Sequence, residues 1–526
     1  MRLLPVVWLL ATCSFSAVNL DAQFRVLPYL QNPAADGMTV VWFSERETPG
    51  SLTLFQSPEP QAAELSLGPI GQWRSAPASA LALAYVDVEA ERFFEGHAPA
   101  PPFRHQIRIS DLQPATKYRY QVHQGEVEFE GFLRTAPAPG TGRVRFVFFA
   151  DSETEPESTG KHVDWPDPES ATSKREYLLD QTAGFANNLR TILSRQPDLI
   201  AISGDLVESG GEQRDWDEFW KHLSDVDGFN LAGRIPLLAA PGNHEYYEGP
   251  SPWGAYSQPA SERAARRFST YFPSSDESRR YTRLDYGPVT LITLDVTNGS
   301  PSASSGDTNF MLLGTQDESG GSSPGFASGS EQYTWLEEQL ADARGKSAFT
   351  FVLFHHVPYS VGPHGWPAGE IGDGLDPQSG VPVRELTPLF LSYGVDAVIA
   401  GHDEMWERSE IEGTQVQADG SEAPHTLQIY DVGIGGDGLR GPQQGLENPQ
   451  QKFLVHTDAP EVWVDEILIS GGKHYGHLEL DVQATEMGCW QAVLKPVHVF
   501  PLLNRDGELL GFERRLYDDT VTLHSD

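Results

Sequence analysis

Short apolar runs that each end on a polar residue are the most regular feature of the chain. Five of them follow residue 140, and each has the length and the β-branched or aromatic content of a buried strand. These runs end at residues 150, 203, 240, 354 and 400. Stretches at 177–193, 216–223, 262–271 and 331–341 have apolar residues near helical spacing, and 280–296 and 427–434 are further strand candidates. This alternation predicts an α/β domain, with helices layered on a sheet.

The chain before residue 138 follows a different pattern, in which apolar and polar residues alternate. Residues 107–122 show this period of two most clearly, and 38–43 and 51–55 are shorter strands rich in β-branched and aromatic residues. A Pro- and Gly-rich stretch at 135–142 has the composition of a linker. At 526 residues the chain is too long for one hydrophobic core. We therefore predict an all-β domain over 23–138 and an α/β domain over 143–526.

The first residues have the character of an export signal. A positive charge at Arg2 precedes an apolar run over 3–11 that is too short to span a bilayer. We predict a signal peptide over 1–22 and a secreted or periplasmic protein, with no transmembrane segment. Because Cys13 would leave with the signal, only Cys489 would remain, and no intrachain disulfide could form.

The formal net charge of -37 narrows the range of partners. It argues against binding to nucleic acid, whose phosphates a protein neutralises with clustered Lys and Arg. It is compatible with a soluble exported protein and with a small anionic substrate, because bound metal ions can dominate the local field. The oligomeric state stays open.

Side chains of the types that bind metals follow the five apolar runs. They are Asp151, Asp205, Asn243 with His244, His355 with His356, and His402. In open α/β sheets, the chemistry sits at the carboxyl ends of the strands. A carboxylate can also bridge two cations about 3.5 to 4 Å apart, which an imidazole does not easily do.

The five blocks resemble those of the calcineurin-like metallophosphoesterases, and most closely the purple acid phosphatase branch. They read Asp151-Ser152-Glu153, Gly204-Asp205-Leu206-Val207-Glu208, Gly242-Asn243-His244-Glu245, His355, and Gly401-His402-Asp403-Glu404. That branch also carries an N-terminal domain of the fibronectin type III kind, and residues 112–120 are similar to its Leu-x-Pro-x-Thr-x-Tyr-x-Tyr stretch. The resemblance implies an all-β sandwich (fibronectin III-like) followed by an α/β metallophosphoesterase domain of the four-layer αββα type.

The resemblance also implies a dinuclear metal site with Asp205 as the bridging ligand. One metal would be held by Asp151, Asp205 and Glu404, and the other by Asp205, Asn243, His355 and His402. His244 and His364 are the candidates for protonating the leaving group. The implied activity is that of a secreted, acid phosphatase-like enzyme that hydrolyses small phosphomonoesters by attack of a metal-activated hydroxide.

Two departures from the family pattern change the expected chemistry. Glu208 stands where the family has its iron-binding tyrosine, and Glu404 stands where it has its last histidine. More oxygen ligands favour iron(III), manganese, magnesium or calcium over zinc at the first position, and we expect no purple colour. We interpret Glu208 as a solvated acid, His356 as a packing residue and 435–438 as a turn near the site.

Two other functions remain open at this point. The same site could prefer phosphodiesters, such as nucleotide or lipid head-group esters, because specificity lies in loops that the sequence does not resolve. Alternatively, the loss of the tyrosine and the histidine could make the chain a non-catalytic surface binding protein with a degenerate metal site. A Gly- and Ser-rich stretch at 298–330 is predicted to be a surface loop.

Overall fold

The computed structural model describes most of the chain. The described residues are 24–57, 68–167, 170–247, 249, 258–274, 279–297, 308, 324–367, 378–417, 419–455, 461–506 and 508–525. The predicted signal peptide, and most of the predicted loop at 298–330, lie outside these residues. Among the described residues, no helix has the length and apolar character needed to cross a membrane.

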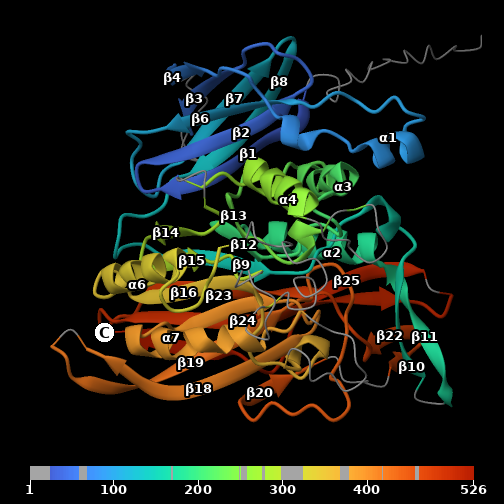
Figure 1. The fold of residues 1–526 in the computed structure, drawn as a ribbon, viewed down its shortest axis with the longest axis vertical. Coiled ribbons are helices and arrows are strands. Elements are labelled where there is room, and N and C mark those ends of the chain that lie inside the picture. Colours follow the sequence, from blue (N-terminus) through green and yellow to red (C-terminus); the bar gives the residue numbers. More distant parts are fainter. Residues whose placement is uncertain are drawn as a thin grey trace, which may run out of the picture.

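The N-terminal part is a sandwich of two four-stranded sheets, which form the upper layer in Figure 1. One sheet has the order β1-β2-β6-β5 and the other β4-β3-β7-β8. Their bounds are Phe24–Ala34 (β1), Gly37–Ser44 (β2), Ser51–Gln56 (β3), Pro69–Arg74 (β4), Ala78–Ser79 (β5), Phe103–Ile109 (β6), Lys117–Gln124 (β7) and Val127–Arg134 (β8). Alternate residues of both sheets share one apolar core, in which Trp42, Leu52 and Tyr120 are fully buried. The strands predicted at 38–43 and 51–55 are therefore present in β2 and β3, whereas the alternating stretch at 107–122 is divided between β6 and β7, which belong to different sheets. The fibronectin-like identity stays a prediction.

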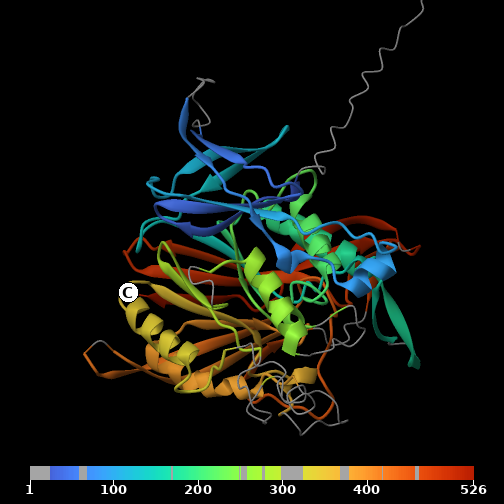
Figure 2. The same cartoon turned by 45° about the horizontal axis from the view of Figure 1, so that its top comes forward.

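One helix in this part of the chain was not predicted from its sequence. Helix α1 (Asp87–Phe93) leaves the sandwich between β5 and β6 and lies against the green helices of the second domain, as Figure 2 shows. The carboxylate of Glu89 accepts a hydrogen bond of 3.0 Å from the backbone N–H of Arg214. The Arg214 guanidinium lies 3.4 Å from the centre of the Phe93 ring. These contacts join distant parts of the sequence, so no local pattern signals them.

The rest of the chain is built around two seven-stranded sheets. The first has the order β13-β12-β9-β23-β24-β25, with β26 also paired to β24, and the second has the order β14-β15-β16-β17-β19-β18-β20. The bounds in the first sheet are Val144–Phe149 (β9), Leu199–Ser203 (β12), Leu237–Ala240 (β13), Gly476–Ala484 (β23), Trp490–Leu503 (β24), Leu509–Leu516 (β25) and Val521–Ser525 (β26). Those in the second are Thr282–Tyr286 (β14), Val289–Thr293 (β15), Phe349–His356 (β16), Ala397–Gly401 (β17), Trp406–Val416 (β18), Glu422–Val432 (β19) and Gln451–Leu454 (β20).

Besides short 3-10 helices, five α-helices and two hairpins are described in this part. The helices are Gln181–Arg195 (α2), Gln213–Ser224 (α3), Gln258–Tyr271 (α4), Glu331–Ala343 (α6) and Thr387–Tyr393 (α7). The hairpins are β10 (His162–Asp167) with β11 (Ser170–Asp180), and β21 (Val462–Val464) with β22 (Ile467–Ser470).

Alternation along the strands divides this domain into four layers. On β9, Phe146 and Phe148 pack into the core between the two sheets, whereas Val147 and Phe149 pack on the opposite side with residues of α2 and α3. The second sheet likewise turns Val352 and other outward residues toward α6 and α7. Helices thus cover the outer face of each sheet, as Figure 1 shows. The predicted α/β fold is confirmed in this form.

Two predicted elements differ from the observed ones. The helix predicted from residue 177 begins at Gln181, because residues up to Asp180 form β11 and the Asp180 side chain caps the helix by accepting from Ala183 N–H at 2.7 Å. The single strand predicted at 280–296 is a hairpin, which turns at Gly287 with a φ of 59°. A left-handed residue suits glycine, and one glycine was too weak a signal to divide the strand.

The two domains share an apolar cluster, in which Tyr29 and Phe43 pack with Trp216, and hydrogen bonds join the sandwich to the loop before β13. Leu30 N–H donates to Ala232 O, and the Asn230 amide donates to Pro28 O, both at 2.9 Å. The buried Tyr120 hydroxyl donates to Gly233 O at 2.8 Å. These hydrogen bonds hold the sandwich against the α/β domain.

The Tyr120 bond gives a direct test of this contact between the domains. We expect Tyr120→Phe to lower the free energy of unfolding by about 1 kcal/mol, because the Gly233 carbonyl loses its donor while packing is kept. The matched control is Tyr286→Phe, since the buried Tyr286 hydroxyl has no hydrogen-bond partner among the described residues. Urea denaturation measures both variants, and equal losses in the two would contradict the assigned role of the Tyr120 bond.

Candidate metal centre

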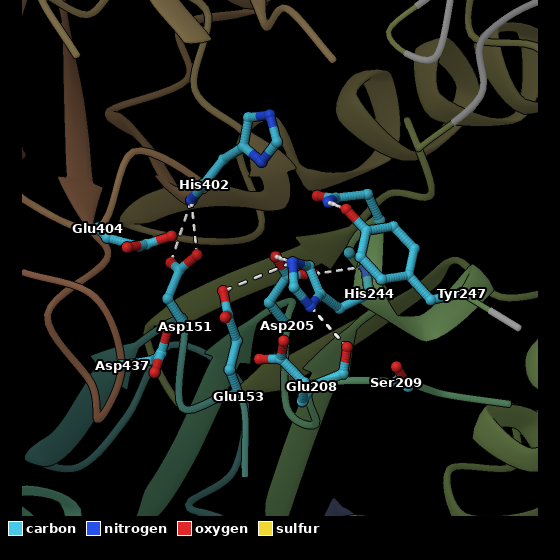
Figure 3. A network of polar contacts seen from close by, with 12 residues as sticks. Asp151, Glu153, Asp205, Glu208, Ser209, His244, Tyr247, His402, Glu404 and Asp437 are labelled. Atoms are coloured by element: carbon cyan, nitrogen blue, oxygen red, sulfur yellow. Dashed lines mark hydrogen bonds and ion pairs between the residues drawn. The ribbon is translucent and has the colours of Figure 1, made fainter. Parts of the chain in front are cut away.

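Five parallel strands bring their carboxyl ends to one place between the two sheets. Asp151 follows β9, Asp205 follows β12 and Asn243 follows β13, all in the first sheet. His355 lies at the end of β16 and His402 directly follows β17 in the second sheet. Figure 3 shows several of these side chains pointing toward one another. The structure thus brings together residues that the sequence spreads over some 250 positions.

The backbone at these strand ends is strained. Five candidate residues have positive φ angles, namely Asp151 (56°), Glu153 (34°), Asp205 (51°), His402 (84°) and Glu404 (48°). Each left-handed residue other than glycine costs roughly 1–2 kcal/mol. Such strain clusters at functional sites, where the surrounding structure holds it in place. The sharp turns carry these side chains away from the strands and into a shared space.

Asp205, His355 and His402 form the first group of ligand atoms, which all lie within 4.8 Å of one another. His355 Nε2 is 2.7 Å from Asp205 Oδ2 and 3.1 Å from His402 Nδ1. Burial opposes charge on both Asp205 and His355. Their mutual attraction outweighs this effect, so it lowers the pKa of Asp205 to about 2 and raises that of His355 to about 9. Asp205 is therefore an anion at neutral pH.

Asn243 presents a free acceptor beside this group. Its side chain is buried, and Nδ2 donates to the Tyr247 hydroxyl and to Gln378 Oε1, both at 2.8 Å. Its Oδ1 has no hydrogen-bond partner among the described residues. A buried acceptor left unpaired is costly, and a cation bound by Oδ1 would remove that cost.

A second group consists of carboxylates. Asp151, Glu153 and Asp205 offer ligand atoms within 4.8 Å of one another, and so do Glu153, Glu404 and Asp437. All five side chains are buried. Burial and repulsion by neighbouring carboxylates raise the pKa of Asp151 and of Glu153 well above the usual range. The protein alone does not compensate this negative charge.

Glu153 is the residue that sequence reasoning missed. It also lies within 4.8 Å of ligand atoms of Glu208 and His244, so it takes part in three groups (Figure 3). A signal was present, because a glutamate stands where the related motif Asp-x-Gly has glycine. Its left-handed φ explains why glycine suits that position, and why a glutamate there needs a compensating role.

Glu404 lies in the centre, together with two acids that were not among its predicted partners. It was predicted to share a metal with Asp151 and Asp205, and ligand atoms of Glu153 and Asp437 also lie within 4.8 Å of its own. Arg440 holds its carboxylate in an ion pair of 2.6 Å. Burial raises the pKa of Glu404 to about 7, although Arg440 opposes the shift. Asp437 had been assigned only to a turn near the site.

The two candidate proton donors flank the centre. His244 Nδ1 lies 2.7 Å from Glu208 O, and its Nε2 lies 3.7 Å from Glu153 Oε1 and 3.8 Å from Asp205 Oδ2. A carbonyl only accepts, so Nδ1 carries a hydrogen and Nε2 faces the centre.

The second donor candidate, His364, lies on the side of His402. Its ring is stacked on that of His402 with centroids 3.6 Å apart, and its Nε2 lies 3.1 Å from Arg440 Nη1. His364 is buried rather than exposed. His356 is also buried, and neither of its ring nitrogens has a hydrogen-bond partner among the described residues.

The donor set fits metal ions. Imidazoles with one carboxylate and an amide oxygen occupy one half of the centre, and carboxylates occupy the other, with Asp205 in both. Hard cations prefer such oxygen-rich surroundings. The unpaired Asn243 Oδ1 and the uncompensated buried acids point to the same conclusion.

Comparison with known proteins assigns the class. Residues 142–403 match the family model of the calcineurin-like phosphoesterases, and the chain belongs to this family. It is therefore a metallophosphoesterase by family, a class of phosphoric ester hydrolases that bind metal ions.

Relatives of known sequence are distant. An uncharacterized protein of Mycobacterium tuberculosis is 28% identical over 374 residues, covering 66% of this chain and 60% of its own length. Purple acid phosphatase 22 of Arabidopsis thaliana is 24% identical over 309 residues, or 58% of this chain and 53% of its own. The chain thus spans at most about three fifths of the length of these two relatives. The solved structure of PhoD shares the fold, with a TM-score of 0.57 at 13% identity over 96% of this chain and 91% of that one.

Glu245 holds the loop that presents Asp205. Its Oε2 accepts from Gly242 N–H at 2.6 Å and from Asp205 N–H at 2.9 Å, and its Oε1 accepts from Leu206 N–H at 2.8 Å. One buried carboxylate thus ties the loop after β12 to the loop after β13.

We expect Glu245→Gln to weaken metal binding and to lower the free energy of unfolding by about 1–3 kcal/mol. The new amide N–H₂ would face backbone N–H groups and leave at least one of them unpaired. Denaturation and elemental analysis after dialysis measure the two effects. Glu47 is exposed, so Glu47→Gln is the matched control. If Glu245→Gln kept the stability and the metal content of the wild type, Glu245 would not hold the Asp205 loop.

Proposed function

We propose that this chain is a dinuclear, metal-dependent phosphatase that hydrolyses phosphomonoesters. The observation that carries the proposal is the position of Asp205, whose carboxylate belongs both to the group with His355 and His402 and to the group with Asp151 and Glu153. A carboxylate shared in this way is what a pair of closely spaced cations requires.

We assign one cation to Asp205, Asn243, His355 and His402, and the other to Asp151, Asp205, Glu153 and Glu404. Bound there, the cations supply positive charge for the phosphoryl oxygens and acidify a water molecule near neutral pH. Iron, manganese, magnesium, calcium and zinc all remain candidates. The carboxylate-rich second set favours a hard ion.

The chain's own residues position and protonate the substrate. His244 is oriented by its Nδ1 bond to Glu208 O, so a protonated His244 can donate from Nε2 to a departing alkoxide. His364 and Arg440 lie on the side of His402. Because Arg440 only donates, His364 Nε2 accepts its hydrogen bond and the ring hydrogen of His364 is on Nδ1. Arg440 therefore provides positive charge for phosphate oxygens, and His364 provides a hydrogen-bond donor. His364 is buried, whereas His244 is half-buried and Arg440 is exposed, so a substrate can reach the latter two.

The domain limits, the export signal and the fibronectin type III-like identity belong to the same proposal. Tyr118 supports the last of these, because its hydroxyl accepts from Gln113 N–H at 2.9 Å, as in a tyrosine corner. The Leu-x-Pro-x-Thr-x-Tyr-x-Tyr stretch carries this tyrosine. A secreted or periplasmic location rests on the apolar N-terminal run.

The variants Asp205→Ala and His364→Ala separate metal binding from proton or charge donation. We expect Asp205→Ala to lose both metals and all hydrolysis of 4-nitrophenyl phosphate, because both groups lose their shared ligand. His364→Ala should keep both metals and lower kcat by roughly 10²–10⁴-fold. Elemental analysis with steady-state kinetics checks both. Loss of metal from His364→Ala, or full activity of Asp205→Ala, would refute the assignment.

Glu153→Gln tests the ligand that has no counterpart in the related motif. We expect this variant to retain about one metal equivalent after dialysis, where the wild type retains two, because one carboxylate of the acidic set becomes neutral. Exposed Glu126, in the turn between β7 and β8, gives the control Glu126→Gln. Two tightly held equivalents in Glu153→Gln would exclude Glu153 as a ligand.

A further inference from the structure

A cavity of about 380 Å³ adjoins the acidic side of the metal centre. Glu208 links the two, because it lines the cavity and also lies within 4.8 Å of ligand atoms of Glu153 and His244. The cavity therefore lies next to Glu208, on the side of the centre where His244 is placed to protonate a leaving group. A substituent that leaves the phosphate on this side has room to extend into it.

Both domains build this cavity. Arg92 and Phe93, at the end of α1, line it from the sandwich domain, and Glu212, Arg214 and Asp215 line it from the start of α3. The carboxylate of Glu89 anchors α1 to Arg214, as described above. The N-terminal domain thus supplies one wall of a space that adjoins the metal centre through Glu208.

Negative charge prevails in the lining. Five carboxylates face the space against three basic side chains. Lys161 Nζ lies 3.3 Å from Glu155 and 3.8 Å from Glu208, and Arg214 pairs with Glu212 at 3.0 Å and with Glu157 at 2.9 Å. These two bases are thus already occupied by four of the acids.

Asp215 is the carboxylate left over. It is 1% exposed, its Oδ2 accepts from Ser209 N–H at 3.0 Å, and its Oδ1 has no hydrogen-bond partner among the described residues. Burial and the charge of Glu212 raise the pKa of Asp215 well above the usual range. A buried acceptor in a negative field calls for a positively charged donor.

We propose that this cavity is the leaving-group subsite and that it takes an alcohol bearing an ammonium group. The preferred substrate is then a phosphate ester of an amino alcohol, with its phosphate at the metal centre and its cation near Asp215 and Glu212. A second anionic group is disfavoured, because it would face the excess of carboxylates. This inference rests on the proposed phosphatase function.

Two esters of equal shape test the charge preference. Phosphocholine has a positively charged quaternary nitrogen where 3,3-dimethylbutyl phosphate has an uncharged quaternary carbon. We expect kcat/KM of the wild type to be about tenfold higher for phosphocholine, which corresponds to about 1.4 kcal/mol. A ratio of one, or a preference for the neutral ester, overturns the proposal.

Variants locate the preference in the cavity. Glu212→Gln and Asp215→Asn should each reduce the ratio to about threefold or less, since each removes one negative charge near the cation. Glu412→Gln, an exposed glutamate on β18 outside the cavity, should keep the wild-type ratio. Thermal unfolding checks that each variant is folded. An unchanged ratio in both cavity variants overturns the proposal.

A binding measurement separates this inference from the phosphatase function. If neither these esters nor 4-nitrophenyl phosphate is hydrolysed, the proposed function fails, and calorimetry with choline decides the subsite. Saturable choline binding that Glu212→Gln weakens at least about fivefold supports the subsite. No choline binding to the wild type overturns it. If 4-nitrophenyl phosphate is hydrolysed but phosphocholine is not preferred over 3,3-dimethylbutyl phosphate, only the subsite proposal is overturned.

Discussion

Buried negative charge that the protein itself does not neutralise is the constraint on which this structure depends. Asp151, Glu153, Asp205, Glu404 and Asp437 are all buried at the ends of strands from two sheets. Arg440 pairs with Glu404 and His355 with Asp205, which leaves Asp151 and Glu153 in a field of like charge. Such an arrangement is stable only with bound cations or retained protons. The left-handed backbone angles show that the fold accepts strain to keep these acids together.

The four-layer architecture explains how the acids converge. Three parallel strands of the first seven-stranded sheet and two of the second end at the same edge of the α/β domain. Glu245 then fixes the loop of Asp205 through three backbone N–H groups. The metal centre therefore depends on both seven-stranded sheets and on how they pack against each other. The sandwich domain adds α1, which reaches the side of the centre beside Glu208.

The sequence allowed much of this to be predicted, and the parts it missed have a common cause. Strand periodicity and the ligand types after each strand are local features, so the α/β fold and the meeting of Asp205 with His355 and His402 followed from them. Glu153 was missed because its importance depends on a backbone angle and on neighbours from other loops. Helix α1 was missed because its docking depends on Arg214, more than a hundred residues away. Two further neighbours of Glu404, Arg440 and Asp437, were not predicted, because they come from a segment with no recognisable motif.

Anomalous diffraction from crystals grown with a divalent cation tests the central claim most directly. Two anomalous peaks about 3.5 to 4 Å apart are expected, with one oxygen of Asp205 bound to each. His355, His402 and Asn243 should surround one peak, and carboxylates including Glu153 the other. A single peak, or two peaks of which Asp205 binds only one, would contradict the account.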